Sequence, residues 1–324
     1  MRAVQFSRFG VPEEVAEVVD RPEPQPGPGE VVVELLASPI NPADLLYLRG
    51  EYGVVPPLPA DAGFEGVARV VALGSDAVTH VQVGDRVLLN GGAWRERAVR
   101  PASEVFPLPR ELPDDQLAML TVNPLTARAM LSEVRLPAGA FVIKNAANSG
   151  VGSVFFALAR RAGLRGVAVV RRPGLEDMLK KFGAEHVLVD GPDLAERVRA
   201  LVGDGSLPLA VDAVGGAATA RLGACVSPGG TVLNYGLLSG EACHLSAFDL
   251  VFRGVVLRGF WLANWFRRTS LHDMQAAYGE LLSLIGEGVV HTPVEASYPL
   301  HRVREALQHA ARGGRDGKVL LRGG

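Results

Sequence analysis

The stretch FVIKNAANSGVGSVFFALA, residues 141–159, joins an apolar strand to a helix through a turn of small residues. This order is typical of a dinucleotide-binding unit, in which the pyrophosphate lies at the N-terminus of the helix. Gly150 and Gly152 would let the backbone and the helix come close to the phosphate groups. Against the spacing G-x-G-x-x-G ending at Gly152, Ala147 and Ser149 replace the first two glycines. The prediction of nucleotide binding therefore depends on the strand before the turn and the helix after it.

The residues after this stretch continue the alternation of strand and helix. Repeated β–α units with apolar, β-branched strands predict an α/β protein with a parallel, doubly wound sheet of the Rossmann type. We expect further helices at 175–184 and 193–202, and further strands at 166–170, 186–190, 209–214, 229–236 and 255–260.

The first hundred residues differ, because short strands are separated there by Pro and Gly. Asn123 followed by Pro124 suits the N-cap and first position of a helix. The tail 289–321 returns to strand, helix and strand, and the pattern alone leaves open which domain it joins. A small, mostly β domain is predicted by the strands expected at 2–6, 30–38, 63–74, 84–89 and 94–100.

Size and composition favour a two-domain globular enzyme. The chain has 324 residues, enough for two separate cores. A formal net charge of −2, with no basic block beside aromatic residues, argues against nucleic-acid binding. No apolar run reaches the roughly 20 residues of a membrane span, and the N-terminus lacks a signal-peptide core, so we expect a cytoplasmic protein that does not bind membranes. Cys225 and Cys243 alone cannot build a disulfide framework or a four-cysteine zinc site.

Two arginines follow the second strand of the expected Rossmann sheet. Arg171 and Arg172 stand where an NAD enzyme places an acidic residue for the ribose 2′-hydroxyl. Guanidinium groups offer charge-assisted, forked hydrogen bonds to phosphate oxygens instead. We therefore predict NADPH as the cofactor; the alternative is that both arginines are solvated loop charges.

Several short motifs occur in order along nearly the whole chain: INPADL (40–45), GEYG (50–53), TVNPLTA (121–127), NAANSGVG (145–152), VVRR (169–172), NYG (234–236) and RGFWL (258–262). With these motifs the chain resembles the medium-chain dehydrogenase/reductase superfamily. Within that superfamily it is similar to the mitochondrial and bacterial trans-2-enoyl thioester reductases, with quinone oxidoreductases as relatives.

The resemblance implies a fold and a set of cofactor residues. A GroES-like, mostly β catalytic domain would comprise residues 1–118 and 281–324, and a Rossmann NADPH-binding domain would comprise residues 119–280. The implied NADPH site contains Asn123, Thr126, Asn148, Ser149, Gly150, Val151, Gly152, Arg171, Arg172, Tyr235, Gly236, Leu237, Leu238, Phe260, Trp261, Leu262 and Lys318.

Tyr52, in GEYG, is the candidate catalytic residue. Reduction of an activated C=C bond needs a hydride for the β carbon, a donor for the charge on the carbonyl oxygen, and a proton for the α carbon. A phenol can meet the last two needs, and the resemblance points to the same residue; simple packing is the alternative. Trp261 is a further catalytic-pocket candidate or else a core or dimer-interface ring. Asn41 could orient Tyr52 or the nicotinamide, or could only form the turn before Pro42.

No metal is expected. The zinc alcohol dehydrogenases of the superfamily need Cys and His ligands in the N-terminal domain, and Ser38 and Phe64 stand in the corresponding segments.

These observations predict an NADPH-dependent, zinc-independent reductase of trans-2-enoyl thioesters, carried on CoA or acyl carrier protein, acting in fatty-acid synthesis. The alternatives are an NADPH:quinone or small enone oxidoreductase, and a non-catalytic NADPH-binding protein with RNA as partner. By resemblance, the strands at 229–236 and 255–260 could pair across a twofold axis, which predicts a homodimer.

Overall fold

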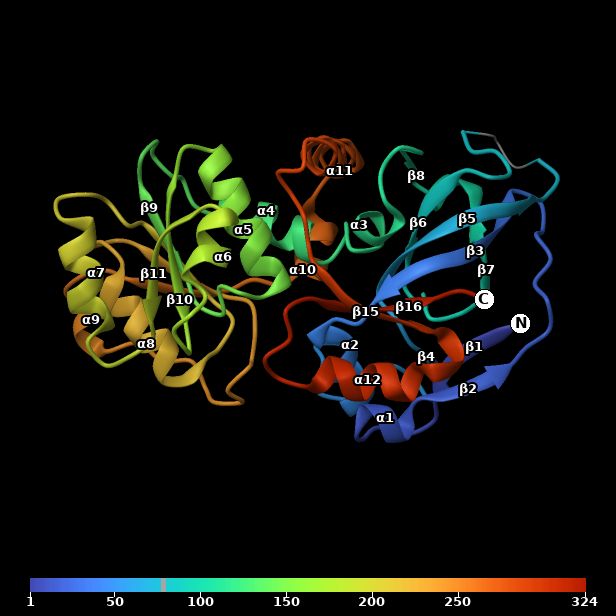
Figure 1. The fold of residues 1–324 in the computed structure, drawn as a ribbon, viewed down its shortest axis with the longest axis horizontal. Helices are drawn as coiled ribbons and strands as arrows, with labels where there is room; N and C mark the ends of the chain where they lie inside the picture. The colour runs from blue at the N-terminus through green and yellow to red at the C-terminus, as the bar shows by residue number, and fades with distance from the viewer. Residues whose placement is uncertain (77–79) are drawn as a thin grey trace. The chain divides into compact units, whose positions relative to one another are not determined.

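The computed structural model describes residues 1–76 and 80–324 and divides into two compact units (Figure 1). The terminal unit joins Met1–Val122 to Thr292–Gly324, and the central unit is Asn123–His291.

The domain boundaries expected after residues 118 and 280 differ from this division. α11 runs unbroken from Leu271 to Gly286, so the expected boundary at 280 falls inside a helix. At the other boundary, the backbone N–H of Val122 donates a 2.7 Å hydrogen bond to Glu65 Oε2, which ties residues 119–122 to the terminal unit.

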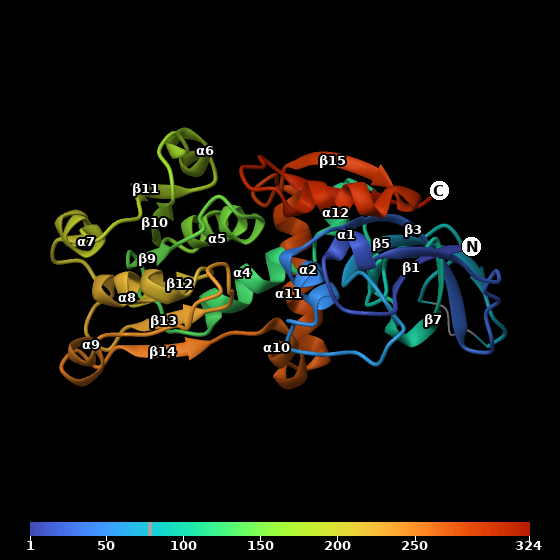
Figure 2. The same cartoon turned by 90° about the horizontal axis from the view of Figure 1, so that it is seen from below.

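The central unit contains the expected parallel, doubly wound sheet. Its strand order is β11-β10-β9-β12-β13-β14, and every neighbouring pair is parallel (Figure 2). This prediction of fold class is confirmed. The strands are β9 (Phe141–Lys144), β10 (Arg165–Val170), β11 (Ala184–Val189), β12 (Leu209–Asp212), β13 (Thr231–Asn234) and β14 (Val256–Gly259).

Helices cover both faces of this sheet. Phe141 and Ile143 of β9 share one apolar cluster with Val198 of α7 and Leu222 of α8. Because side chains alternate along a strand, the intervening residues face the opposite side, where α5 packs against β10 and α4. The helices are α4 (Asn123–Ser132), α5 (Gly150–Arg161), α6 (Glu176–Lys181), α7 (Leu194–Val202), α8 (Gly216–Cys225), α9 (Ala247–Val251), α10 (Leu262–Arg268) and α11.

α4 begins one residue earlier than expected. Asn123 is its first helical residue instead of its N-cap, and Pro124 follows inside the first turn. Pro fits there because the first N–H groups of a helix have no partner within the helix.

The terminal unit is built on a mostly antiparallel sheet, as a GroES-like domain is expected to be. β3 pairs with β5, β7 and β16, and Leu320 of β16 lies opposite Pro39 of β3. The C-terminal tail therefore belongs to this unit. The strands are β1 (Arg2–Phe6), β2 (Glu17–Asp20), β3 (Glu30–Pro39), β4 (Ala60–Asp61), β5 (Glu65–Leu73), β6 (Arg86–Asn90), β7 (Arg97–Pro101), β8 (Pro107–Leu108), β15 (Val294–Pro299) and β16 (Lys318–Arg322).

An apolar core cluster holds the terminal unit together, and Phe6, Leu35, Leu89, Trp94 and Leu321 are among its buried members. α12 packs on α1 and on β16. Among the helices of the described residues, none combines the length and apolarity that crossing a bilayer requires. The helices of this unit are α1 (Pro12–Val15), α2 (Pro42–Arg49), α3 (Asp114–Ala118) and α12 (Val303–Ala311), with 3-10 turns at Ala102–Glu104 and Leu300–Arg302.

Candidate active site

The carboxyl ends of the parallel strands gather most of the predicted cofactor residues of the central unit. In a parallel sheet these ends share one edge, which is where ligands bind in doubly wound folds. β9 leads into the fingerprint turn 145–149, and its neighbour β10 leads into Arg171 and Arg172. The segments 235–238 and 260–262 follow β13 and β14. The structure therefore brings these four segments to one edge of one sheet.

The fingerprint turn fits a pyrophosphate group. Ser149 caps α5, and its Oγ accepts a 3.1 Å hydrogen bond from the N–H of Gly152. A Cβ built on Gly152 would overlap the carbonyl oxygen of Ala147, so only glycine allows the turn and the helix to pack this closely. Asn148 is exposed, and Ser149 and Gly150 are half-buried. The helix N-terminus is thus lined by small residues, and its partial positive charge favours an anion.

Arg171 and Arg172 are placed to add positive charge next to this turn. Both are exposed, and neither forms an ion pair or hydrogen bond with the part of the chain that the structure describes. β10 and β9 are adjacent strands, so the two guanidinium groups follow a strand end beside the fingerprint. Two open cations at this position fit the 2′-phosphate of NADPH.

Backbone hydrogen bonds fix the two later segments. The N–H of Leu238 donates to Ala213 O at 3.1 Å, and the N–H of Phe260 donates to Asn234 O at 2.7 Å. Leu237 and Leu238 are 57% and 62% exposed, so this edge also offers apolar surface. Such a surface next to polar groups suits a ligand with both apolar and charged parts.

The remaining central-unit candidates lie on helices. Asn123 and Thr126 are buried on α4, which packs against both α5 and α10. Trp261 is half-buried and precedes α10 as its N-cap residue, and the guanidinium of Arg267 lies 5.4 Å from the centre of its ring. The structure supports these residues as neighbours of the edge, while their contact with a cofactor stays a prediction.

Sequence reasoning missed a buried polar layer beneath this edge. Asp212 accepts hydrogen bonds from Asn145 Nδ2 at 2.5 Å and from Thr219 Oγ1 at 2.6 Å. Burial raises the pKa of Asp212, but these hydrogen bonds outweigh it and leave the pKa below its usual range. Lys144 is fully buried, and its Nζ donates to the hydroxyl of Tyr235 at 2.8 Å. Burial lowers the pKa of Lys144 to about 7.

A sequence signal for this layer exists. Lys144, Asp212 and Asn234 are each the last residue of a strand whose preceding residues are apolar, apart from Thr231. A polar residue at the carboxyl end of a buried parallel strand points to the ligand-binding edge, and this pattern was available without the structure.

Tyr52 lies in the loop after α2, within an aromatic cluster of the terminal unit. Gly50 ends α2 with φ 77°, and a Cβ there would lie 2.8 Å from Phe9 Cγ. The ring of Tyr52 is centred 5.0 Å from that of Phe64 and 6.4 Å from that of Tyr47. The tyrosine is half-buried. Its ring is therefore held by neighbours, although it lies in a loop rich in Gly and Pro.

Asn41 does more than form a turn before Pro42. It is 1% exposed, and its Nδ2 donates a 2.8 Å hydrogen bond to Glu65 Oε1. Lys318, which was predicted to line the NADPH site, donates from Nζ to Asn41 Oδ1. The structure thus brings two candidate residues together with Glu65, a residue that the sequence analysis did not select.

Comparison with known proteins agrees with the resemblance carried by the motifs. Residues 27–110 match the alcohol dehydrogenase GroES-like domain, and residues 150–287 match the zinc-binding dehydrogenase model. The human mitochondrial enoyl-[acyl-carrier-protein] reductase is 36% identical over 317 residues, which cover 95% of this chain and 85% of that protein. The chain belongs to the enoyl thioester reductase branch of the medium-chain dehydrogenase/reductase superfamily. The same-named protein of Caenorhabditis elegans is 36% identical over 82% of this chain and 78% of its own length.

Solved structures share the fold of this reductase. A Bacillus thuringiensis protein assigned provisionally as an NADPH:quinone reductase superposes with a TM-score of 0.91 at 30% identity, over 99% of this chain and 98% of that one. The mitochondrial 2-enoyl thioester reductase heterodimer of Candida tropicalis gives a TM-score of 0.88 at 25% identity, over 99% of both chains.

In this reductase, internal contacts occupy the two positions considered for zinc ligands. Ser38 Oγ donates a 2.5 Å hydrogen bond to the backbone oxygen of Glu65. The ring of Phe64 packs between those of Tyr47 and Tyr52. Both residues therefore hold the strand and the aromatic cluster near Tyr52.

Proposed function

We propose that the protein is an NADPH-dependent reductase that saturates the C=C bond of trans-2-enoyl thioesters without zinc. The observation that carries this proposal is the 36% identity to the human enoyl-[acyl-carrier-protein] reductase across 95% of the chain. The site chemistry agrees with it. An anion-binding turn with two open arginines accounts for NADPH, and an aromatic hydroxyl accounts for the proton.

NADPH, held by the turn 148–152 and by Arg171 and Arg172, would supply a hydride to the β carbon of the substrate. The phenol of Tyr52 donates a hydrogen bond to the thioester carbonyl oxygen, where negative charge develops as the C=C electrons shift. The same phenol then gives its proton to the α carbon and regains one from water. The Phe64 and Tyr47 rings beside Tyr52 restrict the directions that its hydroxyl can take.

The test is a substrate comparison. We expect NADPH oxidation with crotonyl-CoA and with the same acyl group on acyl carrier protein, together with formation of the saturated thioester. The thioester that is reduced faster, on CoA or on acyl carrier protein, would identify the natural carrier. Absence of the saturated product with both would refute the proposal.

A second candidate is the reduction of a quinone or small enone. The specific observation in its favour is the TM-score of 0.91 with the protein provisionally assigned as a quinone reductase. Both reactions share the cofactor but differ in substrate. A 1,4-quinone oxidising NADPH much faster than crotonyl-CoA, at equal concentrations, would favour this second function.

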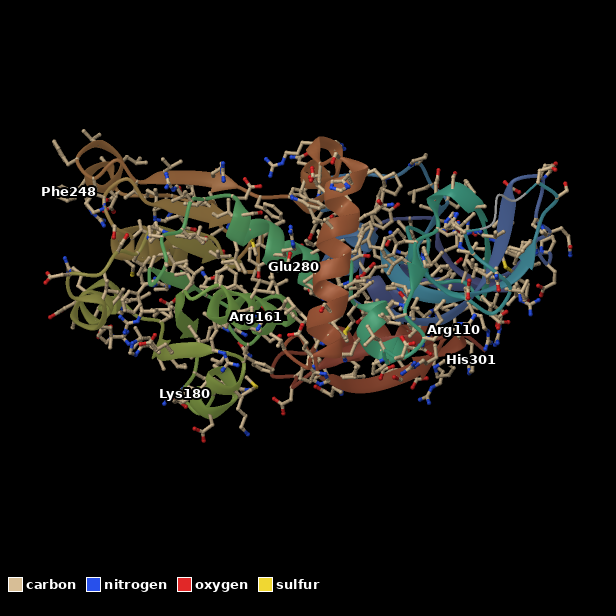
Figure 3. The ribbon with its side chains drawn as sticks, turned by 90° about the horizontal axis from the view of Figure 1, so that it is seen from above. Arg110, Arg161, Lys180, Phe248, Glu280 and His301 are labelled. Carbon is tan, nitrogen blue, oxygen red and sulfur yellow. The ribbon has the colours of Figure 1, made fainter. Side chains whose placement is uncertain are left out.

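We further propose that the protein forms a homodimer through the edge of its central sheet. β14 is the last strand of that sheet, so one side of it lacks a partner strand within the described residues. Beside it, Phe248, Val251 and Phe252 are 62%, 71% and 77% exposed, and Figure 3 shows Phe248 projecting outward from α9. An open strand edge beside an apolar patch is a ready pairing surface.

The dimer is tested by Phe252→Asp, which places a charge in that patch. Sedimentation should show a dimer for wild type and a monomer for Phe252→Asp. Val83→Asp changes an exposed apolar residue of the terminal unit and should leave the dimer intact. A monomeric wild type, or a dimeric Phe252→Asp, would refute this interface.

We also propose a cytoplasmic location and a role in fatty-acid synthesis. Cys225 and Cys243 are both free, which suits a reducing compartment. Cell fractionation with an antibody to the protein tests the location, and loss of saturated acyl products on deletion tests the role.

A further inference from the structure

Four polar side chains form a buried network in the terminal unit. Asn41 and Asp44 come from the start of α2, Glu65 begins β5, and Lys318 begins β16. Their exposed fractions are 1%, 2%, 1% and 7%. Polar and charged groups are costly to bury unless they are hydrogen-bonded and paired. The free-energy cost of burying these groups suggests that the network has a function in the protein.

Every carboxylate oxygen of the network accepts a hydrogen bond. Asp44 Oδ2 accepts from the N–H of Asn41 at 2.8 Å, and Asp44 Oδ1 accepts from the N–H of Phe64 at 3.0 Å. Glu65 Oε1 accepts from Asn41 Nδ2 at 2.8 Å, and Glu65 Oε2 accepts from the N–H of Val122 at 2.7 Å. The two side chains thus fix the backbone at the start of α2, before β5 and at the end of the unit's first segment.

The network reaches Tyr52 through one residue. The backbone N–H of Phe64 is hydrogen-bonded to Asp44, and Phe64 directly precedes Glu65 in the sequence. The centre of its ring lies 5.0 Å from that of the Tyr52 ring. The planes of the two rings are tilted by 42°. A shift in Phe64 would therefore move the surface against which the tyrosine packs.

The charges of the network do not balance when all its groups are ionised. Asp44 and Glu65 together carry two negative charges against the single positive charge of Lys318. Burial raises the pKa of both carboxyl groups to about 7. Burial lowers the pKa of Lys318 to about 8, the two carboxylates oppose that decrease, and the nearby Arg315 adds to it.

We propose that Asp44, Glu65 and Lys318 are positioning residues for Tyr52, and that they hold Phe64 in place only while one proton offsets the second carboxylate. The proposal rests on the proposed function of Tyr52 as proton donor. It predicts that raising the pH above neutrality leaves two buried carboxylates facing one ammonium group that is itself losing its proton. The network then loosens, and the tyrosine changes its surroundings.

The sign of the accompanying stability change follows from the pKa shifts. The pKa of Glu65 is raised from 4.5 to about 7 by folding, so its contribution to stability is present below pH 4.5 and is lost as the pH rises to about 7. The pKa of Lys318 is lowered from 10.5 to about 8, so its contribution to stability is present above pH 10.5 and is lost as the pH falls to about 8, a separate window of opposite sign. Glu65→Gln should therefore lose less stability than wild type between pH 4.5 and 7, measured by urea unfolding.

The decisive experiment observes Tyr52 without any substrate. In protein labelled with ¹³C at the tyrosine ζ carbon, Tyr52→Phe identifies the Tyr52 resonance among those of the five tyrosines. In wild type this resonance should shift with a midpoint near pH 7, and in Glu65→Gln, where Lys318 balances the one remaining carboxylate, it should shift much less. Glu34→Gln is the matched control, because Glu34 pairs with Arg69 and Arg97 on the surface of the same unit. In this variant the Tyr52 resonance should shift as it does in wild type.

A Tyr52 resonance that does not shift in wild type, or that shifts equally in Glu65→Gln, would overturn the proposal. The wild-type titration decides alone if Glu65→Gln does not fold. Turnover adds a second readout: kcat of wild type should fall about tenfold above neutral pH, that of Glu65→Gln should change far less, and KM for NADPH should stay constant in both. If the Tyr52 resonance shifts but no enoyl thioester is reduced, the proposed function is refuted, while the proposed link between the network and Tyr52 is retained.

Discussion

The cofactor edge of the central unit and the Tyr52 region of the terminal unit treat charge in opposite ways. At the edge, Arg171 and Arg172 are exposed and form no ion pair with the described residues. In the Tyr52 region, the charged side chains are those of Asp44, Glu65 and Lys318. All three are buried, and each forms a hydrogen bond with a backbone N–H or with the side chain of Asn41. Open charges are available to a ligand, whereas enclosed charges can only act on the protein around them.

This difference separates residues that set the affinity for the cofactor from residues that set the geometry of the reacting groups. A cation that meets the ligand contributes binding energy in the ground state and in the transition state alike. A group that acts only on the reacting atoms contributes to the transition state. Substitutions at the edge should therefore change KM for the cofactor, and substitutions at Tyr52 should change kcat.

The largest effect is expected from Tyr52→Phe. This change keeps the ring and its packing against Phe64 but removes the hydroxyl. Turnover of crotonyl-CoA should fall by about a hundredfold or more, because both charge stabilisation and proton transfer are lost. kcat and kcat/KM should fall together, while the affinity for NADPH and the melting temperature stay near wild type.

Tyr47→Phe is the matched control for that experiment, since Tyr47 lies in the same aromatic cluster. It should retain activity within a few-fold. A Tyr52→Phe protein that keeps its kcat but melts earlier would show that the tyrosine is structural, and the contrast between the two regions would then disappear.

The next largest effect is expected from Arg171→Ala. KM for NADPH should rise about ten- to a hundredfold, the equivalent of roughly 1.5 to 3 kcal/mol for a charge-assisted hydrogen bond. KM for NADH should change little, because NADH lacks the 2′-phosphate. Lys180→Ala, which removes an exposed cation from α6 of the same unit (Figure 3), should leave both constants unchanged. Equal losses with both cofactors would argue against a phosphate contact.

The open half of this contrast could be predicted from the sequence, and the enclosed half could not. Strand, turn and helix at 141–159 locate the pyrophosphate site because local patterns encode local structure. Arg171 follows from its position after the next strand. These residues lie in local motifs whose chemistry and spacing are both visible in the sequence, and their contact with NADPH stays a prediction.

The buried network was not predicted as a unit because, apart from the local pair Asn41 and Asp44, its members are far apart in the sequence. Lys318 lies 277 positions from Asn41, which accepts its hydrogen bond, and a single sequence gives no sign of that pairing. Asp44 lay inside the motif INPADL, which was selected for Asn41, and Glu65 follows Phe64, which was considered only as a zinc-ligand position. The boundary expected at 280 differs from the division of the structure after His291 for a related reason: the end of a long helix depends on tertiary packing as well as on residue preferences.

Gly152→Ala tests how closely the backbone of the fingerprint turn packs against α5 in the central unit. The added methyl group would overlap Ala147 O, so the turn must open, at a cost of about 1 to 3 kcal/mol in the free energy of unfolding. Gly279→Ala is the matched control, because Gly279 is helical and nothing lies within 4 Å of its built Cβ. It should stabilise the protein by about 1 kcal/mol. Denaturant titrations of both variants test this; similar stability changes would mean that the turn is not tightly packed.

The smallest effect is expected from metal removal. Asp44 and Glu65 could be taken for metal ligands, because they are two buried carboxylates in one unit. All four of their oxygens already accept N–H hydrogen bonds, and a cation there would have to compete with those bonds. Lys318 supplies the positive charge that a metal would otherwise bring. Dialysis against a chelator should therefore leave kcat and the melting temperature unchanged, and elemental analysis should find no stoichiometric zinc. Activity that disappears with the chelator and returns with zinc would mean that these carboxylates bind a metal, and the terminal unit, like the central one, would then direct its charges at a ligand.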